Sequence, residues 1–167
     1  MEAEDRVNSP SHYRADGQPE CIIILEVLVK RFKKIAALCF GQFKYLYRAG
    51  LKKEEGMTID TKSREDVKKL VWYIKHIRYI FYKESKDLVF YADQPSRIPK
   101  PLFDRYVDEN ETTADFYKKQ VIKAFQYGKD EKLKEHIENC IRLVFDFTTF
   151  EELDEIIKEL EYIAENI

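Results

Sequence analysis

The sequence predicts a mainly α-helical protein: a small helical bundle with an irregular N-terminal arm and a C-terminal helical appendage. Three observations support this fold class. The 167 residues include only 5 Gly and 5 Pro, too few for a turn-dense all-β architecture. Hydrophobic residues make up 44% of the chain, which is enough to build a buried core. Over most of the chain these apolar residues recur every three or four positions, as in an amphipathic helix.

The N-terminal part is predicted to form two helices after an irregular arm. Residues 1–19 contain prolines, a glycine and small polar residues, a composition that favours an arm without regular structure. The apolar run over residues 20–32 is longer than a typical buried strand, so we expect a buried helix there. Residues 35–49 place apolar side chains at helical spacing, and Gly50 is expected to cap this second helix at its C-terminus.

The middle of the chain is predicted to hold one long helix between two links. Residues 51–62 are charged and are expected to be a solvated link. Ser63 followed by Asp66 resembles a capping box, so the helix should begin there and run to about Lys83. Residues 85–112 contain three prolines, which indicates a linker or an extended arm.

Three more helices are predicted in the C-terminal part, over residues 113–127, 130–147 and 150–165. A glycine should end the first of them, and Thr149 with Glu152 forms a capping box at the start of the last. The predicted domain organisation is therefore a motif-bearing domain, a linker and a three-helix unit, over residues 1–84, 85–112 and 113–167.

Composition excludes several classes of protein. The chain has 29 Lys and Arg against 31 Asp and Glu, so no global positive field favours bulk nucleic-acid binding. The three cysteines are far apart and include no CxxC pair, which argues against a disulfide framework or a zinc knuckle. No apolar run approaches the ~18 residues that a membrane span needs, and the acidic start does not resemble a secretory signal. We therefore expect a soluble intracellular protein without a membrane partner.

The usual catalytic motifs are absent from the sequence. GxxxxGK[ST], GxGxxG, HExxH and GxSxG do not occur, which excludes ordinary nucleotide folds, serine hydrolases and zinc peptidases. The last helix carries acids at the spacing of a magnesium site, but no clear second set faces them. A solvated acidic face is the better interpretation of these residues, which are Glu151, Glu152, Glu155 and Glu159.

A polar stripe on the second helix is the strongest candidate site. Gly41, Lys44, Tyr45 and Arg48 lie at positions i, i+3, i+4 and i+7. A lysine and an arginine one turn apart can hold a phosphate, while a tyrosine ring stacks or donates a hydrogen bond. The alternative is an ordinary solvated helix face. Gln42 must find hydrogen-bond partners if it is buried, which either a ligand or a core contact would supply.

Four short motifs follow one another between residues 5 and 80. They are Val7, Asn8, Pro10, His12 and Tyr13; Gly17, Glu20, Cys21 and Ile22; Phe40, Gly41, Lys44, Tyr45, Arg48, Ala49, Gly50 and Lys52; and Glu65, Asp66, Lys68 or Lys69, Trp72 and Tyr73. In this order they resemble the SaV-like family of small phage proteins. The resemblance does not extend beyond about residue 85.

The resemblance implies nucleotide handling, because one phage member of the family is a nucleoside monophosphate kinase that lacks the usual phosphate loop. Ile23 stands where an acid often follows the glutamate, so the resemblance leaves open whether Mg²⁺ is bound for catalysis. The sequence also departs from the family pattern at two other positions: Gln42 is found where the family tends to have Asn, and Leu70 where Ala is usual. The residues predicted to bind the ligand are His12, Tyr13, Glu20, Gln42, Lys44, Tyr45, Arg48, Asp66, Lys69 and Tyr73.

Two functions are predicted from these observations. The first is a nucleotide-binding phage protein in the cytoplasm of the infected host cell, acting as a kinase-like enzyme or as a sponge for a host-defence signalling nucleotide. It requires the arm bearing His12 to fold back, so that Lys44, Arg48 and Asp66 line one hollow. The second is an inhibitor that contacts a host factor through aromatic residues such as Trp72. Trp72 lies on a second face of its helix, away from the apolar face, which also predicts a homo-oligomer.

Overall fold

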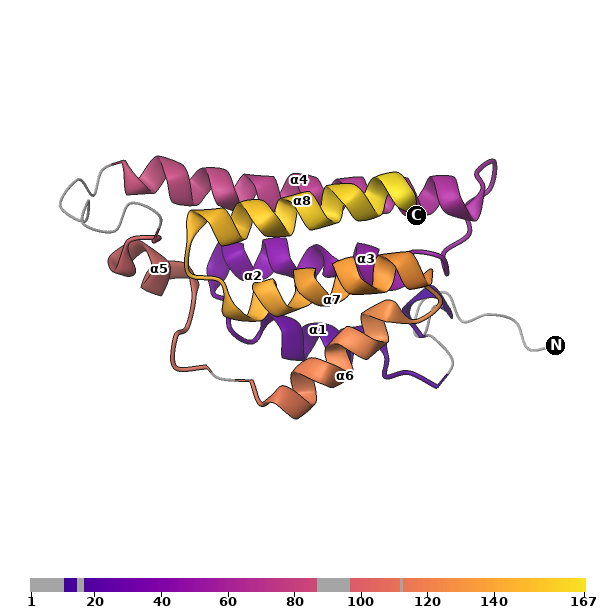
Figure 1. Ribbon diagram of the computed structural model, residues 1–167, viewed down its shortest axis with the longest axis horizontal. Coiled ribbons are helices and arrows are strands. Elements are labelled where there is room, and N and C mark those ends of the chain that lie inside the picture. Colours follow the sequence, from indigo (N-terminus) through magenta and orange to yellow (C-terminus); the bar gives the residue numbers. More distant parts are fainter. Residues whose placement is uncertain (1–10, 15–16, 87–96, 112) are drawn as a thin grey trace.

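The computed structural model describes residues 11–14, 17–86, 97–111 and 113–167 (Figure 1). These residues are mainly helical and include no β-strand, only isolated bridges, which confirms the predicted fold class. Within them, no helix combines the length and the apolar character needed to cross a bilayer. The irregular structure predicted for residues 1–10 lies outside the described residues.

The N-terminal part forms short helices. A 3-10 turn, η1 (Ser11–Tyr13), precedes α1 (Cys21–Val29), which is only half buried because Ile22 and Ile23 are 60% and 51% exposed. The predicted helix is present, but the prediction that it is buried holds for one face only, since the other face of α1 does not meet the core.

The second predicted helix is divided in two. It consists of α2 (Lys34–Phe40), the 3-10 turn η2 (Gly41–Phe43) and α3 (Lys44–Arg48). Gly50 follows α3 with a φ of 86°, in the left-handed region that glycine adopts without strain. The predicted C-terminal cap is therefore confirmed, and it turns the chain back toward the next helix.

The long helix α4 (Ile59–Ser85) begins one turn earlier than predicted. Its N-cap is Thr58, whose side chain accepts a hydrogen bond of 3.1 Å from the backbone N–H of Thr61. Ser63 and Asp66 lie inside the helix and are buried, so the predicted capping box was wrong. Both side chains are used for tertiary contacts instead.

A further helix, α5 (Lys100–Tyr106), lies within the predicted linker. Leu102 and Phe103 are 1% exposed, so this segment is part of the core rather than an extended arm. Two of the prolines that suggested a linker, Pro99 and Pro101, lie at the start of this helix. A proline fits there because its missing N–H would have no partner in the first turn of a helix. The prediction for this segment was wrong for that reason.

The three C-terminal helices are α6 (Asp115–Gln126), α7 (Glu131–Asp146) and α8 (Phe150–Asn166), close to the predicted bounds. The Thr149 capping box is confirmed, since its hydroxyl accepts a hydrogen bond of 3.1 Å from the N–H of Glu152. In Figure 1, α8 lies along α4 and α7 lies below it.

One hydrophobic core joins the two ends of the chain. The ring of Phe40 in α2 stacks on that of Phe32 with 3.9 Å between centroids. Phe147, which follows α7, lies 5.9 Å from Phe40 and 6.0 Å from Phe103 of α5. The C-terminal helices therefore share their core with the motif-bearing helices, and this common packing fixes α3 against α4.

Candidate functional site

The centre of the candidate site is an ion pair between α3 and α4. Arg48, the last residue of α3, donates from Nε to Asp66 Oδ2 at 2.8 Å and from Nη2 to Oδ1 at 2.9 Å. The side chains are 6% and 1% exposed. Two parallel bonds between a guanidinium and a carboxylate fix both groups in position, because the planar fork matches the two oxygens.

The N-terminal arm reaches this ion pair. The third donor of the guanidinium, Arg48 Nη1, hydrogen-bonds to the hydroxyl oxygen of Tyr13 at 2.9 Å. The ring of His12 lies 4.2 Å from that of Tyr13. The arm therefore folds back onto α3, as the sequence predicted, and it brings Tyr13 beside Arg48 and Asp66.

Two lysines of α4 complete the arrangement. Lys62 is 4% exposed, and its Nζ lies 3.3 Å from Asp66 Oδ1 and 2.7 Å from Glu54 Oε2. Lys69 Nζ lies 3.1 Å from Glu65 and 3.9 Å from Asp66. Asp66 thus faces three cations. We call the group the Arg48–Asp66 cluster, and it comprises Tyr13, Tyr45, Arg48, Lys62, Asp66 and Lys69.

The half-buried ring of Tyr45 forms one side of the cluster. Its centroid lies 4.8 Å from the guanidinium carbon of Arg48 and 5.9 Å from Lys69 Nζ. Lys44 Nζ, one residue earlier in the chain, is 5.3 Å away. These distances are within the range of cation–π attraction, so the ring helps to hold like charges near one another.

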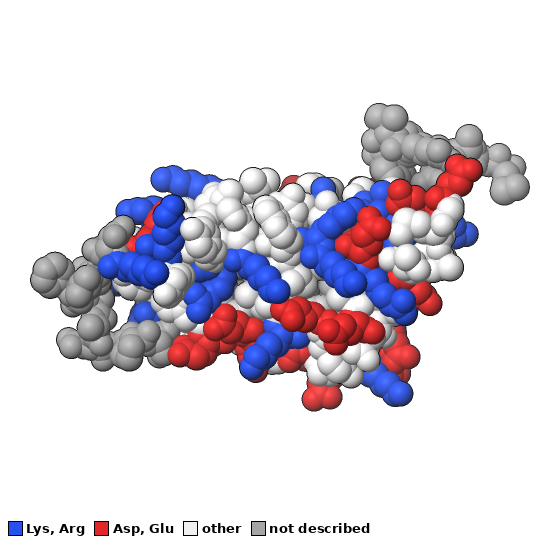
Figure 2. Space-filling model, turned by 90° about the horizontal axis from the view of Figure 1, so that it is seen from above, with Lys and Arg blue, Asp and Glu red and all other residues white. Residues whose placement is uncertain are grey.

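Positive charge exceeds negative charge around the cluster. Glu54, Glu65 and Asp66 balance the three cations that pair with them. Lys44 and Lys52 form no ion pair with any described residue, which leaves a formal excess of two positive charges. Figure 2 shows Lys and Arg side chains gathered toward the end of the molecule where α4 begins, with acidic side chains among them.

The charges act on one another, as their pKa values show. Burial opposes the charge of Arg48, but the hydrogen bonds and attraction of Asp66 outweigh it and raise the Arg48 pKa. The hydrogen bond that Lys62 donates to Glu54 raises the pKa of Lys62. By contrast, burial and then repulsion from Arg48 and Lys62 lower the pKa of Lys52. An anion bound beside Lys52 would relieve this repulsion.

Five of the predicted ligand residues are not part of the cluster. Two of them, His12 and Lys44, lie next to it, near the rings of Tyr13 and Tyr45. The other three have separate surroundings. Glu20 is exposed at the start of α1. Gln42 donates to the carbonyl oxygen of Leu38 at 3.2 Å, a bond one turn back that satisfies its amide locally. The ring of Tyr73 packs edge to face against Trp72, with 5.1 Å between centroids.

Lys62 and Lys52 are the residues that sequence reasoning missed. The signal for Lys62 was its position four residues before Asp66, the spacing of neighbours on a helix face. It was not used because residues 51–62 were interpreted as a solvated link. The contact of Ser63 was missed because this residue was interpreted as a helix cap. Its hydroxyl accepts a bond of 2.8 Å from the N–H of Gly50, which ties the turn after α3 to α4.

A buried lysine anchors α3 from the opposite half of the chain. Lys129 follows α6, is 8% exposed and donates from Nζ to the carbonyl oxygens of Ala49 at 2.6 Å and Tyr47 at 3.3 Å. These carbonyls belong to the C-terminal end of α3, where a cation is favourable. Burial lowers the pKa of Lys129 to about 8.

The cluster is unsuited to a metal ion. In the described residues no group of three or more His, Cys, Asp or Glu side chains could hold one. Both oxygens of Asp66 already accept from Arg48, and Lys62 lies beside them. Arg48 and Lys62 would repel a metal cation at this position, whereas Lys44 and Lys52 would attract an anion.

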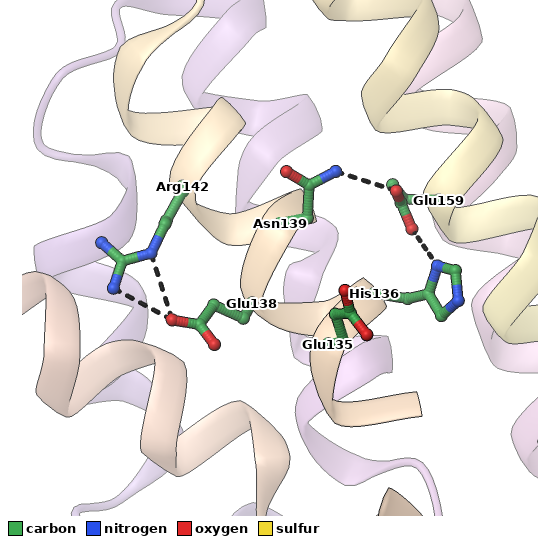
Figure 3. A pocket seen from close by; sticks show the side chains of 6 residues that line it. All are labelled: Glu135, His136, Glu138, Asn139, Arg142 and Glu159. Carbon is green, nitrogen blue, oxygen red and sulfur yellow. Dashed lines mark hydrogen bonds and ion pairs between the residues drawn. The ribbon is translucent and has the colours of Figure 1, made fainter. Parts of the chain in front are cut away.

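A separate groove of about 350 Å³ lies on α7 and α8. Figure 3 shows Arg142 with Glu138 on one side of it and Asn139, Glu159 and His136 on the other. Glu159 accepts from Asn139 at 2.8 Å and lies 2.5 Å from His136 Nδ1. The polar groups of this groove pair mainly with one another, and its acids do not favour an anion.

The excess of cations therefore makes the Arg48–Asp66 cluster the better candidate for an anionic ligand. No known protein family, curated protein or solved structure matches this chain.

Proposed function

We propose that this protein binds a nucleotide, with the phosphate held next to Lys44, Lys52 and Lys69. The observation that carries the proposal is the excess of positive charge around Tyr45 and Asp66. A phosphate would supply the missing negative charge and accept hydrogen bonds from the lysines. The resemblance to the SaV-like family supports a nucleotide over other phosphorylated molecules.

In this proposal Arg48 positions the site rather than holding the phosphate. Its Nε, Nη1 and Nη2 atoms already donate to Asp66 and Tyr13. Breaking those bonds would leave Asp66 without its principal partner, at 1% exposure. Lys44 and Lys52 can bind a ligand without breaking an ion pair with any described residue. Tyr13 is the arm residue fixed beside Arg48.

Binding without turnover is the form of this function that the chemistry supports best. Phosphoryl transfer relies on metal ions at the phosphates, and the described residues provide no metal cluster. The proposal is therefore a phage-derived protein that sequesters a host-defence signalling nucleotide in the host cytoplasm. A kinase-like reaction with Mg²⁺ is the alternative that the family resemblance implies.

The test is a thermal-shift panel of nucleoside mono-, di- and triphosphates and cyclic nucleotides. A ligand at a hundredfold excess over its Kd should stabilise the fold by about 2.7 kcal/mol. Lys52→Ala should weaken binding about tenfold or more, and Lys44→Ala should do the same. Lys53→Ala is the matched control, because this neighbouring lysine is exposed and is not one of the proposed phosphate-binding lysines. Nucleotide binding that persists unchanged in both the Lys44→Ala and the Lys52→Ala variant would overturn the proposal, as would the absence of any shift.

A second assay separates a sponge from an enzyme. The protein is incubated with nucleoside monophosphates, ATP and Mg²⁺, and the nucleotides are separated by chromatography. A bound nucleotide that is recovered unchanged supports sequestration. Formation of a diphosphate, lost in Lys44→Ala, would instead establish phosphoryl transfer at this site.

A second candidate function is inhibition of a host protein. The observation in its favour is the exposure of Trp72 and Tyr79 on α4, 60% and 58%. Exposed aromatic residues of this size are common contact points between proteins. If this function is correct, Trp72→Ala should abolish inhibition while the thermal shifts with nucleotides stay unchanged.

A further inference from the structure

The exposed face of α4 carries a row of cations and aromatic rings. Trp72, Tyr79 and Tyr82 are 60%, 58% and 47% exposed. Basic side chains alternate with them every three or four residues, and the row itself contains no acid. We call it the basic row, and it consists of Arg64, Lys68, Trp72, Lys75, Tyr79, Tyr82, Lys83 and Lys86.

The neighbouring helix α8 carries an acidic row on the same face. Its exposed residues also include one aromatic ring, Tyr162. In Figure 2, which looks onto this face, acidic side chains form a band beside the basic ones. The acidic row consists of Glu151, Glu155, Glu161 and Glu165. One exposed lysine, Lys158, lies among them, so this face of α8 carries a net negative charge rather than acids alone.

Two ion pairs between α4 and α8 show which residues of the two rows lie at the same height along the helix axes. Lys75 pairs with Glu161 at 3.2 Å, and Arg78 pairs with Asp154 at 3.0 Å. From the first pair to the second, the residue number increases in α4 and decreases in α8, so the two helices are antiparallel. At the spacing that these pairs define, Trp72 lies level with Tyr162.

The same spacing places charges of opposite sign at equal levels near both ends of the face. Lys68 lies level with Glu165, and Lys83 lies level with Glu151. None of these four side chains forms an ion pair with another described residue.

We propose that this face binds a second copy of the chain, with a twofold axis parallel to α4 and α8. This symmetry lays α4 of each copy on α8 of the other, so each basic row meets an acidic row. Residues at equal levels then face one another across the interface. Trp72 of one copy packs against Tyr162 of the second copy, which removes both rings from water.

The net charges of the two rows disfavour the other arrangements of this face. An axis perpendicular to the helices would lay α4 on α4 and bring cations together. A single-stranded nucleic acid would match the basic row, but the acidic row beside it would repel the phosphates. A second copy is complementary to both rows at once.

The face is large enough for a stable dimer. The 17 residues of α8 extend over about 25 Å, and two packed helices present a surface roughly 20 Å wide. The accessible area of such a face is of the order of the ~800 Å² per partner that a specific interface buries.

The first test is the mass of the particle in solution, measured by light scattering across a dilution series. We expect a dimer at twice the chain mass of 20.0 kDa. Trp72→Ala should weaken dimerisation about tenfold or more. Phe116→Ala is the matched control, because this ring on α6 is 64% exposed but lies away from the face. A wild-type protein that is monomeric at every concentration would overturn the proposal.

The second test reverses the charges of each row separately. One variant combines Lys68→Glu with Lys83→Glu, and the other combines Glu151→Lys with Glu165→Lys. Each alone should be a folded monomer by circular dichroism and light scattering, because like charges would meet across the interface. An equimolar mixture should form a dimer again, since each reversed row then meets its complement.

The mixing experiment separates this dimer from other assemblies. Two variants that stay dimeric alone, or that fail to associate when mixed, contradict the proposed arrangement. A wild-type monomer that binds a single-stranded oligonucleotide would point to another function, if the variant that combines Lys68→Glu with Lys83→Glu no longer binds it. That result would assign the basic row to nucleic acid instead.

Discussion

Arg48 and Asp66 form a bidentate ion pair with two hydrogen bonds of 2.8 and 2.9 Å, almost completely removed from solvent. The pair joins the last residue of α3 to the second turn of α4. Because each group is fixed by the other, the lysines and tyrosines around them are also held in place. The pair is therefore a structural requirement of the site as well as part of it.

Asp66→Asn should destabilise the protein strongly. The substitution removes the carboxylate that pairs with the Arg48 guanidinium and leaves this buried cation without its partner, beside the second buried cation Lys62. Breaking a buried pair in this way costs about 3–5 kcal/mol. Urea denaturation, followed by circular dichroism, measures the loss in free energy of unfolding.

The control is Asp154→Asn. Asp154 pairs with Arg78 at 3.0 Å, but its side chain is 48% exposed. An exposed pair contributes less than about 1 kcal/mol because water screens the charges. Equal losses in the two variants would show that the Arg48–Asp66 pair is not stabilised by burial as described.

The helix bounds in the C-terminal half were predictable because local signals decide them. Thr149 and Glu152 form the capping box at the start of α8, and α6 and α7 follow their apolar periodicity. The start of α4 was not predicted, because the Ser63 and Asp66 spacing imitates a cap while both side chains serve contacts with α3. A local pattern does not reveal that a distant segment competes for its side chains.

Thr149→Ala should cost about 1 kcal/mol of stability. The hydroxyl accepts a bond from the N–H of Glu152, and Glu152 in turn accepts one from the N–H of Thr148 at 3.2 Å. Loss of the hydroxyl leaves an N–H at the start of α8 without its partner. Thermal unfolding measures the loss, and Thr149→Ser, which keeps the hydroxyl, should recover most of it. A serine variant as unstable as the alanine variant would contradict the role of the cap.

The site itself was only partly predictable. The spacing of Lys44, Tyr45 and Arg48 identified the stripe, and Tyr13 was expected beside it. The charge balance depends on Lys62 and Lys52, and these join the site only because α4 begins early and packs against α3. Such tertiary placement follows from the shared core, which no single segment encodes.

Substitution of two glycines by alanine should have opposite effects. Gly50→Ala should destabilise by about 1–2 kcal/mol, because its φ of 86° lies in the left-handed region that a Cβ disfavours. Gly41 has a φ of −60°, and a Cβ there would meet no atom within 4 Å. Gly41→Ala should therefore stabilise by about 0.4–1 kcal/mol, since it restricts the unfolded chain. Thermal unfolding of both variants checks the signs; a stabilised Gly50→Ala would contradict the turn after α3.

Lys129 should make stability depend on pH in the alkaline range. Its pKa is about 8 in the folded protein, because burial penalises the charge, against an ordinary value of 10.5. Below pH 8 the lysine is charged in both states and the folded state bears the full penalty. Between about pH 8 and 10.5 the folded protein loses the proton first, so its stability rises with pH.

The measurement is the difference in free energy of unfolding between the wild type and Lys129→Met, taken by urea denaturation at several pH values. The variant keeps a long apolar side chain and removes the titrating group, so other ionisations cancel in the difference. This difference should shift in favour of the wild type by up to about 3 kcal/mol between pH 8 and 10.5. A flat difference would mean that the carbonyl oxygens of Tyr47 and Ala49 offset the burial of the charge. In that case Lys129 would hold the end of α3 as a full cation throughout this range.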